Sequence, residues 1–252
     1  MVAREWTFPR VLAHRCGGSL APENTLAGLA VAASLGCRGV EFDVMLSGDG
    51  TPVLIHDETL ERTTNGCGRV AATPDKVLFA ADAGSRFDPR FSGERIPALP
   101  DALNRCRALG LALNLEIKPS AGMDEATADA VVEGLRRHWG PAAPPLLVSS
   151  FSRAALQRVA AIAPELHLGV LVEAMPADWR QRCAEVNAVS LNPRHSGLDA
   201  DLVGEVRAAG LRIACYTVNE AARARALLAW GVDCVITDRP DLVRVTDGGA
   251  GV

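Results

Sequence analysis

The sequence predicts an α/β protein that folds as a TIM (β/α)8 barrel with a small insertion after the second strand. Eight short apolar, β-rich runs alternate with Ala-, Leu- and Arg-rich stretches that carry a helical pattern. Strands that alternate with helices indicate a parallel sheet. Eight such units in 252 residues match the usual size of a barrel. A doubly wound open sheet is the alternative that the same alternation allows.

The predicted strands are spread over nearly the whole chain. They cover residues 10–15, 39–46, 111–119, 146–151, 167–172, 188–193, 212–218 and 234–240. Helical patterns between them include residues 23–36, 124–139, 152–163 and 219–231. Four glycines follow helical stretches, where a left-handed C-cap is expected: Gly36, Gly110, Gly210 and Gly231.

The second and third predicted strands are separated by much more chain than any other neighbouring pair. This stretch holds the run DGTPVLIHD and then roughly forty residues with few helical signals. We expect a single domain over residues 1–252, with an inserted segment at about 57–99. The insertion should lie above the C-terminal face of the barrel, where the loops carry the chemistry of this fold.

Composition narrows the class of protein and its surroundings. The chain is 48% hydrophobic and 22% charged, which is a globular composition, and its net charge of −4 argues against nucleic acid as a partner. No apolar run is long enough to span a membrane, and the N-terminus does not read as a signal peptide. The seven cysteines form no C-x-x-C pair, so we expect free thiols in the cytoplasm and no cysteine zinc site. The sequence carries no signal for an oligomeric state.

Two predicted strands carry charged pairs that together supply three carboxylates for a cation. Glu41 and Asp43 are separated by one residue, so they share a face of their strand. Glu116 and Lys118 do the same on the next barrel strand. Either pair alone could be a surface salt bridge, but both follow apolar barrel strands, which favours convergence at one site. Three carboxylates fit Mg²⁺ or Ca²⁺ better than zinc.

Two histidines belong to the same end of the barrel. His14 ends the first strand, and His56 ends the run VLIH after an Asp-Gly turn signal. A two-residue loop at Asp49 and Gly50 places His56 opposite Asp43, and a small slip in register still folds His56 over the carboxylates. Two histidines beside a cation are an acid–base pair for a displacement near neutral pH.

Positive charges at this end favour a phosphate substrate. Arg15 and Lys118 follow the first and third strands, and a guanidinium can bind two phosphate oxygens in one plane. Five further residues at or just past strand ends could line the pocket or serve as core or capping residues: Phe151, Asn192, Tyr216, Asn219 and Asp238.

An ordered set of motifs resembles the glycerophosphodiester phosphodiesterases, most closely the short bacterial cytosolic type. The match runs from about Val11 to Asp241 and includes HR, APENTLAG, VEFDV, DGTPVLIHDETLERTTNG, LNLEIKP, SSF, YTVN and GVDCVITDRP. The resemblance implies a TIM barrel with a small insertion after the second strand. It also implies hydrolysis of small glycerophosphodiesters to sn-glycerol 3-phosphate and an alcohol, with one divalent cation, Mg²⁺ or Ca²⁺.

The resemblance also assigns roles to residues of this chain. It makes His14 and His56 the acid–base pair, and we assign His14 as the base and His56 as the acid. The remaining assignments are metal binding by Glu41, Asp43 and Glu116, phosphate binding by Arg15 and Lys118, and further substrate contacts by Asn24, Phe151 and Tyr216. The chain departs from the family's usual HRG at Cys16, and we expect Gly17 and Gly18 to form the turn instead.

Three other functions remain open at this point. A Schiff-base aldolase could use Lys118, and a binding module without turnover could keep the phosphate pocket. A lysophospholipase D would need an apolar groove, for which the polar insertion gives no obvious signal. The sequence leaves open the alcohol, the choice between Mg²⁺ and Ca²⁺, and whether water or the glycerol 2-hydroxyl attacks first.

Overall fold

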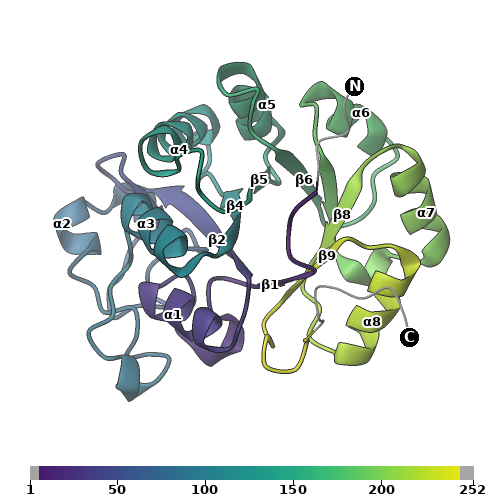
Figure 1. The fold of residues 1–252 in the computed structure, drawn as a ribbon. Coiled ribbons are helices and arrows are strands. Elements are labelled where there is room, and N and C mark those ends of the chain that lie inside the picture. Colours follow the sequence, from purple (N-terminus) through teal and green to yellow (C-terminus); the bar gives the residue numbers. More distant parts are fainter. Residues whose placement is uncertain (1–5, 245–252) are drawn as a thin grey trace.

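The computed structural model describes residues 6–244, and eight parallel strands in it close into a barrel surrounded by helices (Figure 1). The strand order is β1-β9-β8-β7-β6-β5-β4-β2, and a pairing between β1 and β2 closes the ring. This closure confirms the TIM barrel and rules out the doubly wound open sheet. The barrel strands are β1 (Val11–Ala13), β2 (Gly39–Leu46), β4 (Ala112–Ile117), β5 (Leu146–Ser150), β6 (Leu168–Val172), β7 (Ser190–Pro193), β8 (Arg212–Cys215) and β9 (Cys234–Thr237).

Helices connect the strands on the outside of the barrel. They are α1 (Leu26–Ser34), α3 (Leu99–Leu109), α4 (Asp124–His138), α5 (Arg153–Ile162), α6 (Trp179–Glu185), α7 (Ala200–Ala208) and α8 (Ala221–Trp230). Each of the four predicted C-cap glycines has a positive φ, as expected for a left-handed end of a helix.

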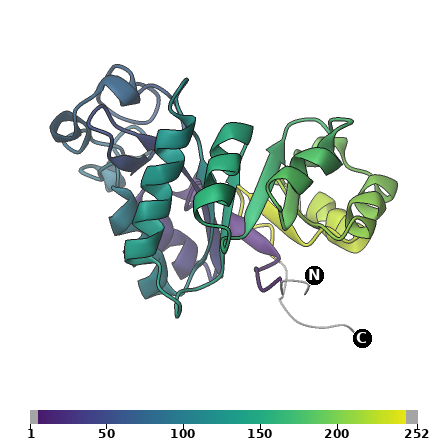
Figure 2. The same ribbon diagram turned by 90° about the horizontal axis from the view of Figure 1, so that it is seen from above.

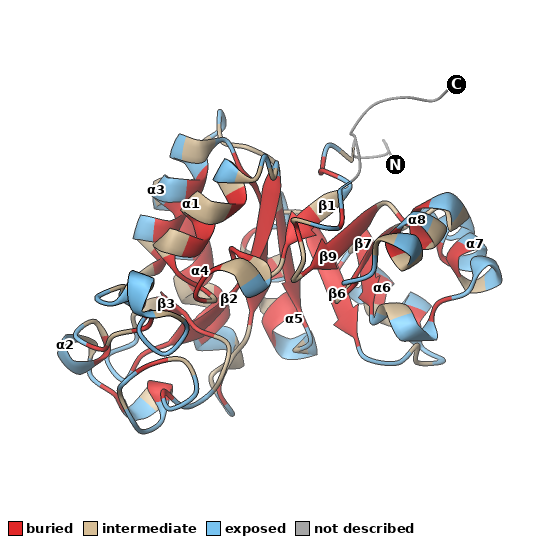
Figure 3. Cartoon of the chain, turned by 90° about the horizontal axis from the view of Figure 1, so that it is seen from below, coloured by how far each residue is buried: buried red, intermediate tan, exposed pale blue. Residues whose placement is uncertain are grey.

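The packing of β2 shows why the strands hold their inner residues firmly. Val40, Phe42 and Val44 alternate with the acidic residues and are fully buried in the main core against the helix layer. Burial of such side chains contributes roughly 1.5–3 kcal/mol each. Figure 3 shows the resulting pattern, with buried strands inside and exposed surfaces on the outer faces of the helices. Because Val40, Phe42 and Val44 pack against the helices, the alternating residues Glu41 and Asp43 point to the inside of the barrel.

A segment between β2 and α3 lies to one side of the barrel (Figure 2). It begins with β3 (Pro52–Leu54), which pairs antiparallel with β2, and contains the short helix α2 (Asp75–Leu78) and two 3-10 turns. The segment has a small core of its own, made of Met45, Val53, Ile55, Leu60, Val70, Leu78, Ala81, Ala83 and Ile96.

The β2–β3 hairpin differs from the expected register. Val44 pairs with Leu54 and Met45 with Val53, so the loop has three residues, and Gly50 adopts φ +80°. The ladder ends at Leu54, and the Asp43 carbonyl accepts from the N–H of Ile55 at 3.2 Å, so the pairing is shifted by one position from His56, within the small slip that the sequence allows. The extra loop residue is the cause, because it shifts each pair by one position.

The loop after β1 also turns in an unexpected way. Cys16 itself has φ +75°, whereas Gly17 has φ −111°, so the expectation that Gly17 and Gly18 alone form the turn is wrong. Cys16 is fully buried against Gly28 of α1, where a Cβ would lie 2.9 Å from the Cβ of Cys16. A glycine on the neighbouring helix therefore provides the space that the cysteine needs.

Gly18, in the loop after β1, lies in close contact with the backbone of Asp238, which follows β9. It has φ +60°, and a Cβ there would lie 2.3 Å from the carbonyl oxygen of Asp238.

We predict that Gly18→Ala lowers the free energy of unfolding by about 2–4 kcal/mol, because strain in φ and a backbone clash combine. Gly36→Ala, where φ is also positive but nothing lies within 4 Å, should cost only about 1 kcal/mol. Chemical denaturation measures both, and equal losses would contradict the prediction.

Candidate active site

Three carboxylates converge at the C-terminal end of the barrel. Glu41 and Asp43 lie on β2 and Glu116 on β4, and Asp43 pairs in register with Glu116. All three are buried, with at most 9% of their surface exposed. One oxygen from each lies within 4.8 Å of the others. This spacing allows one ion to contact all three residues.

The protein balances the three negative charges of this cluster only in part. Burial and the nearby charge of Asp43 raise the pKa of Glu41 to about 7. The same two causes raise the pKa of Glu116 well above its usual value. The nearest cations are Arg15, whose Nε lies 3.7 Å from Asp43, and Lys118, whose Nζ lies 3.7 Å from Glu116. Buried oxygen ligands that repel one another fit a hard divalent cation, which removes the repulsion.

Asn24 holds one member of the cluster in place. Its side-chain amide donates to Asp43 at 2.9 Å, and its side-chain oxygen accepts from the Asp43 backbone N–H at 3.2 Å. Asn24 is buried and has φ +56°, a conformation that asparagine tolerates better than most residues. The structure thus places Asn24 behind Asp43, where it positions the carboxylate.

Both predicted histidines are held by an aspartate in the same way. Nδ1 of His14 lies 2.6 Å from Asp238, and Nδ1 of His56 lies 2.7 Å from Asp57. Nε2 of His14 lies 3.8 Å from Glu41. An aspartate on Nδ1 fixes the ring orientation and leaves Nε2 to exchange protons.

The two histidines have different electrostatic surroundings. For His14, burial lowers the pKa, but the hydrogen bond to Asp238 and the charge of Glu41 outweigh it, so the pKa is raised. For His56, burial lowers the pKa, and the charges of Arg15 and Lys118 add to this effect. A cation held by Glu41 would oppose that residue's influence on His14.

The sequence did not single out Asp57, and it offered Asp238 only as a residue that could line the pocket or serve as a core or capping residue. Asp238 follows the last strand, β9, which lies beside β1 and so brings Asp238 to His14. Asn219, considered as a helix cap, instead donates to Asp238 at 2.9 Å, while Glu220 occupies the cap position of α8. Asp57 directly follows His56, and Arg62 lowers its pKa well below the usual range. The adjacency of His56 and Asp57 was the available signal.

The remaining predicted residues flank the carboxylates. Phe151 and Tyr216 meet edge to face with ring centroids 5.9 Å apart, and Phe151 is 45% exposed. The Tyr216 hydroxyl donates to the Val172 carbonyl at 3.0 Å, so the phenol ring is the part that can face a ligand. A cavity of about 400 Å³ lies here, lined by residues that include Glu116, Lys118, Ser150 and Phe151.

The barrel thus carries a buried acidic cluster that could hold a metal ion, two histidines that are each held by an aspartate, and two cationic side chains beside the cluster. The chain matches the glycerophosphoryl diester phosphodiesterase family over residues 14–242, and it belongs to that family. Its enzyme class is glycerophosphodiester phosphodiesterase. Family membership removes the Schiff-base aldolase from consideration.

Several relatives cover nearly the whole chain. A glycerophosphodiester phosphodiesterase from Caldanaerobacter subterraneus subsp. tengcongensis is 32% identical, over 92% of this chain and 94% of its own. The structure of an Oleispira antarctica phosphodiesterase, in complex with the product sn-glycerol-3-phosphate, is 41% identical with a TM-score of 0.91 and covers 94% of this chain and 95% of that one. A glycerophosphodiester phosphodiesterase from Agrobacterium tumefaciens is 31% identical with a TM-score of 0.76, over 94% of this chain and 99% of its own.

The raised pKa of Glu41 leads to a stability prediction. Its pKa of about 7 lies above the unfolded value of 4.5, so the folded protein is progressively destabilised as pH rises from 4.5 to 7 without a cation. We predict that Glu41→Gln stabilises the EDTA-treated protein at pH 8 by about 1–3 kcal/mol, because glutamine carries no charge. The gain should disappear below about pH 4.5.

Thermal melting with EDTA and with Ca²⁺ checks this. Added Ca²⁺ should raise the melting temperature of the wild type more than that of the variant, because binding stabilises the folded state. A Glu41→Gln variant that is less stable than the wild type at pH 8 in EDTA would contradict the prediction.

Proposed function

We propose that the protein hydrolyses glycerophosphodiesters to sn-glycerol 3-phosphate and an alcohol, with one Mg²⁺ or Ca²⁺ held by Glu41, Asp43 and Glu116. The observation that carries this proposal is the set of three buried carboxylates beside two histidines that are each held by an aspartate. The product named in the Oleispira antarctica complex supports the same substrate class.

Arg15 and Lys118 are the substrate-binding cations in this proposal. They flank the carboxylates and lie 3.7 Å from Asp43 and Glu116, respectively. From these positions they bind the free oxygens of the phosphodiester and stabilise the charge that develops at phosphorus. The cation, when bound, supplies additional charge stabilisation as a Lewis acid.

The two histidines move the protons. The base takes a proton from the attacking hydroxyl as its oxygen bonds to phosphorus, and the acid gives a proton to the alcohol oxygen as its bond to phosphorus breaks. The raised pKa of His14 and the lowered pKa of His56 favour the reverse of the assignment made from the sequence, with His56 as the base and His14 as the acid that protonates the leaving alcohol. The attacking hydroxyl is that of water, or the glycerol 2-hydroxyl followed by opening of a cyclic phosphate by water. Asp238 and Asp57 keep each Nδ1–H hydrogen-bonded while Nε2 exchanges the proton.

The proposed substrate is a small molecule in the cytoplasm. The thiols support this compartment, because all seven cysteines are free and five of them are buried. None of the helices within residues 6–244 combines the length and apolar character needed to cross a bilayer. Large exposed apolar side chains in that range are few and scattered (Val77, Phe87, Phe151 and Leu242), which supports a head-group diester over a lysophospholipid.

The reaction itself can be tested with glycerophosphoglycerol, whose alcohol is uncharged. We expect release of sn-glycerol 3-phosphate with added Mg²⁺ or Ca²⁺ and none with EDTA, measured by an enzyme-coupled assay. Activity that persists in EDTA would refute the cation site. A folded, cation-loaded protein that releases nothing would leave a binding module as the better description.

The histidines give a second prediction. His14→Gln and His56→Gln should each lower kcat by about 10²–10⁴-fold, because each removes one proton transfer. The wild type should show a bell-shaped pH profile, rising as the base loses its proton and falling as the acid loses its own. Each variant should lack one limb of that profile. His138→Gln, at the end of α4 far along the chain from either histidine, is the matched control and should behave as the wild type.

A further inference from the structure

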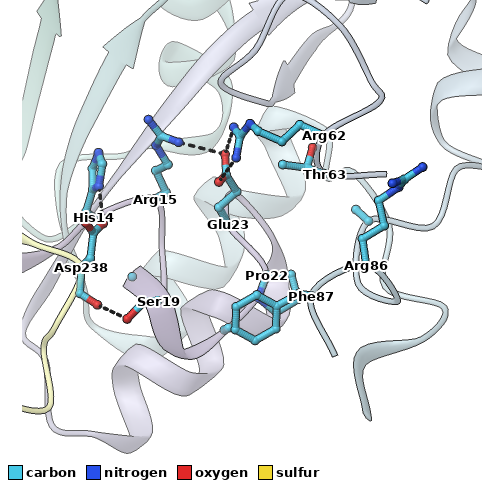
Figure 4. A pocket seen from close by; sticks show the side chains of 13 residues that line it. His14, Arg15, Ser19, Pro22, Glu23, Arg62, Thr63, Arg86, Phe87 and Asp238 are labelled. Carbon is cyan, nitrogen blue, oxygen red and sulfur yellow. Dashed lines mark hydrogen bonds and ion pairs between the residues drawn. The ribbon is translucent and has the colours of Figure 1, made fainter. Parts of the chain in front are cut away.

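A second cavity borders the active site on the side of His14. It has a volume of about 430 Å³, within the range of small-molecule sites. One wall is the loop after β1, including Ser19, Pro22 and Glu23, and the other wall comes from the segment between β3 and α3. Figure 4 shows His14 and Asp238 at one end of this cavity and Arg86 at the other. The cavity thus leads from the catalytic group to the inserted segment.

The charges that line this cavity are paired, with one exception. Glu23 accepts two hydrogen bonds from Arg62, each 2.7 Å long, and one from Arg15 at 3.1 Å. Arg62 also binds Asp57, and Asp238 is held by His14 and Asn219. The carboxylates around this cavity are therefore already neutralised by neighbouring cations and donors.

Arg86 is the unpaired charge. Its Nε donates to the Thr64 carbonyl, which orients the guanidinium, and the exposed Glu61 is the carboxylate whose charge acts on it from beyond ion-pair distance. Among the residues that the structure describes, no carboxylate lies within ion-pair distance of Arg86. The neighbouring Phe87 is 44% exposed and adds an apolar surface to the same wall. An anion with a short carbon chain suits this pair of residues.

The cavity on the other side of the carboxylates has the opposite character. It is lined by Glu58, Glu116 and Asp124 against the single cation Lys118, together with the exposed ring of Phe151. Glu58 pairs with Arg69, so the two remaining acidic groups outnumber the one cation there, and the uncharged glycerol carbons can pack on the aromatic ring. The two cavities therefore suit two different substituents of one phosphodiester.

We propose that the cavity between His14 and Arg86 binds the leaving alcohol, and that Arg86 selects alcohols that carry an anionic group. This inference rests on the proposed function. All glycerophosphodiesters share the glycerol phosphate half, so preference among them arises only where the enzyme contacts the alcohol. An exposed arginine contributes modestly, and we expect a preference of about 3–10-fold that weakens at high salt.

Three substrates with leaving alcohols of different charge test the proposal. They are glycerophosphocholine (cationic), glycerophosphoglycerol (neutral) and bis(glycerophospho)glycerol, whose leaving alcohol carries a second phosphodiester (anionic). We expect kcat/KM of the wild type to be highest for the anionic alcohol and lowest for the cationic one. In Arg86→Gln, the ratio of kcat/KM for the anionic over the cationic alcohol should fall at least 3-fold, and Arg86→Lys should retain most of it.

Arg90→Gln is the matched control, because Arg90 is exposed, pairs only with Asp88 in the described structure and does not line the cavity. Its substrate ratio should equal that of the wild type. Activity without any charge preference, or an unchanged ratio in Arg86→Gln with a normal melting curve, overturns this proposal while leaving the proposed function intact. If none of the three substrates is hydrolysed with either Mg²⁺ or Ca²⁺, this proposal and the proposed function are both overturned.

Discussion

The repulsion among three buried carboxylates is the constraint on which the rest of the active site depends. Glu41, Asp43 and Glu116 are held within 4.8 Å of one another in a place that water hardly reaches. Protons or a cation must offset this repulsion, and the raised pKa of Glu41 is its direct consequence. The protein tolerates the arrangement because β2 and β4 are locked together in register and bury their other faces under the helices.

The carboxylates also set the positions of their neighbours. Arg15 donates its backbone N–H to Glu41 at 2.9 Å and directs its side chain toward Asp43. Two positive φ angles, at Arg15 and Cys16, make this possible, and the absence of a side chain at Gly28 leaves room for the turn. The strained loop after β1 is therefore explained by what it holds, since its backbone and side chain both contact the acidic cluster.

Each of the two histidines has an aspartate hydrogen-bonded to its Nδ1, but the two aspartates come from different parts of the chain. His56 is held by the next residue along the chain, whereas Asp238 is 224 residues from His14 in sequence. Closure of the barrel brings the ends of β1 and β9 together, so the fold itself completes the second pair. The inserted segment then adds the outer wall of the cavity beside His14. It contributes arginines to that cavity, whereas the charged side chains that line the cavity beside Glu116 are mainly acidic.

Local patterns in the sequence determined the eight strands, the C-cap glycines and the shared faces of Glu41, Asp43, Glu116 and Lys118. These features follow from the period of a strand or the end of a helix, which neighbouring residues fix. Only the tertiary structure decided the three-residue hairpin loop, the positive φ of Cys16, the contact of Asn24 with Asp43, the pairing of Asp238 with His14, and the unpaired state of Arg86. Each of these depends on segments that meet only after the barrel has closed, because register and close approach are set by packing between distant parts of the chain.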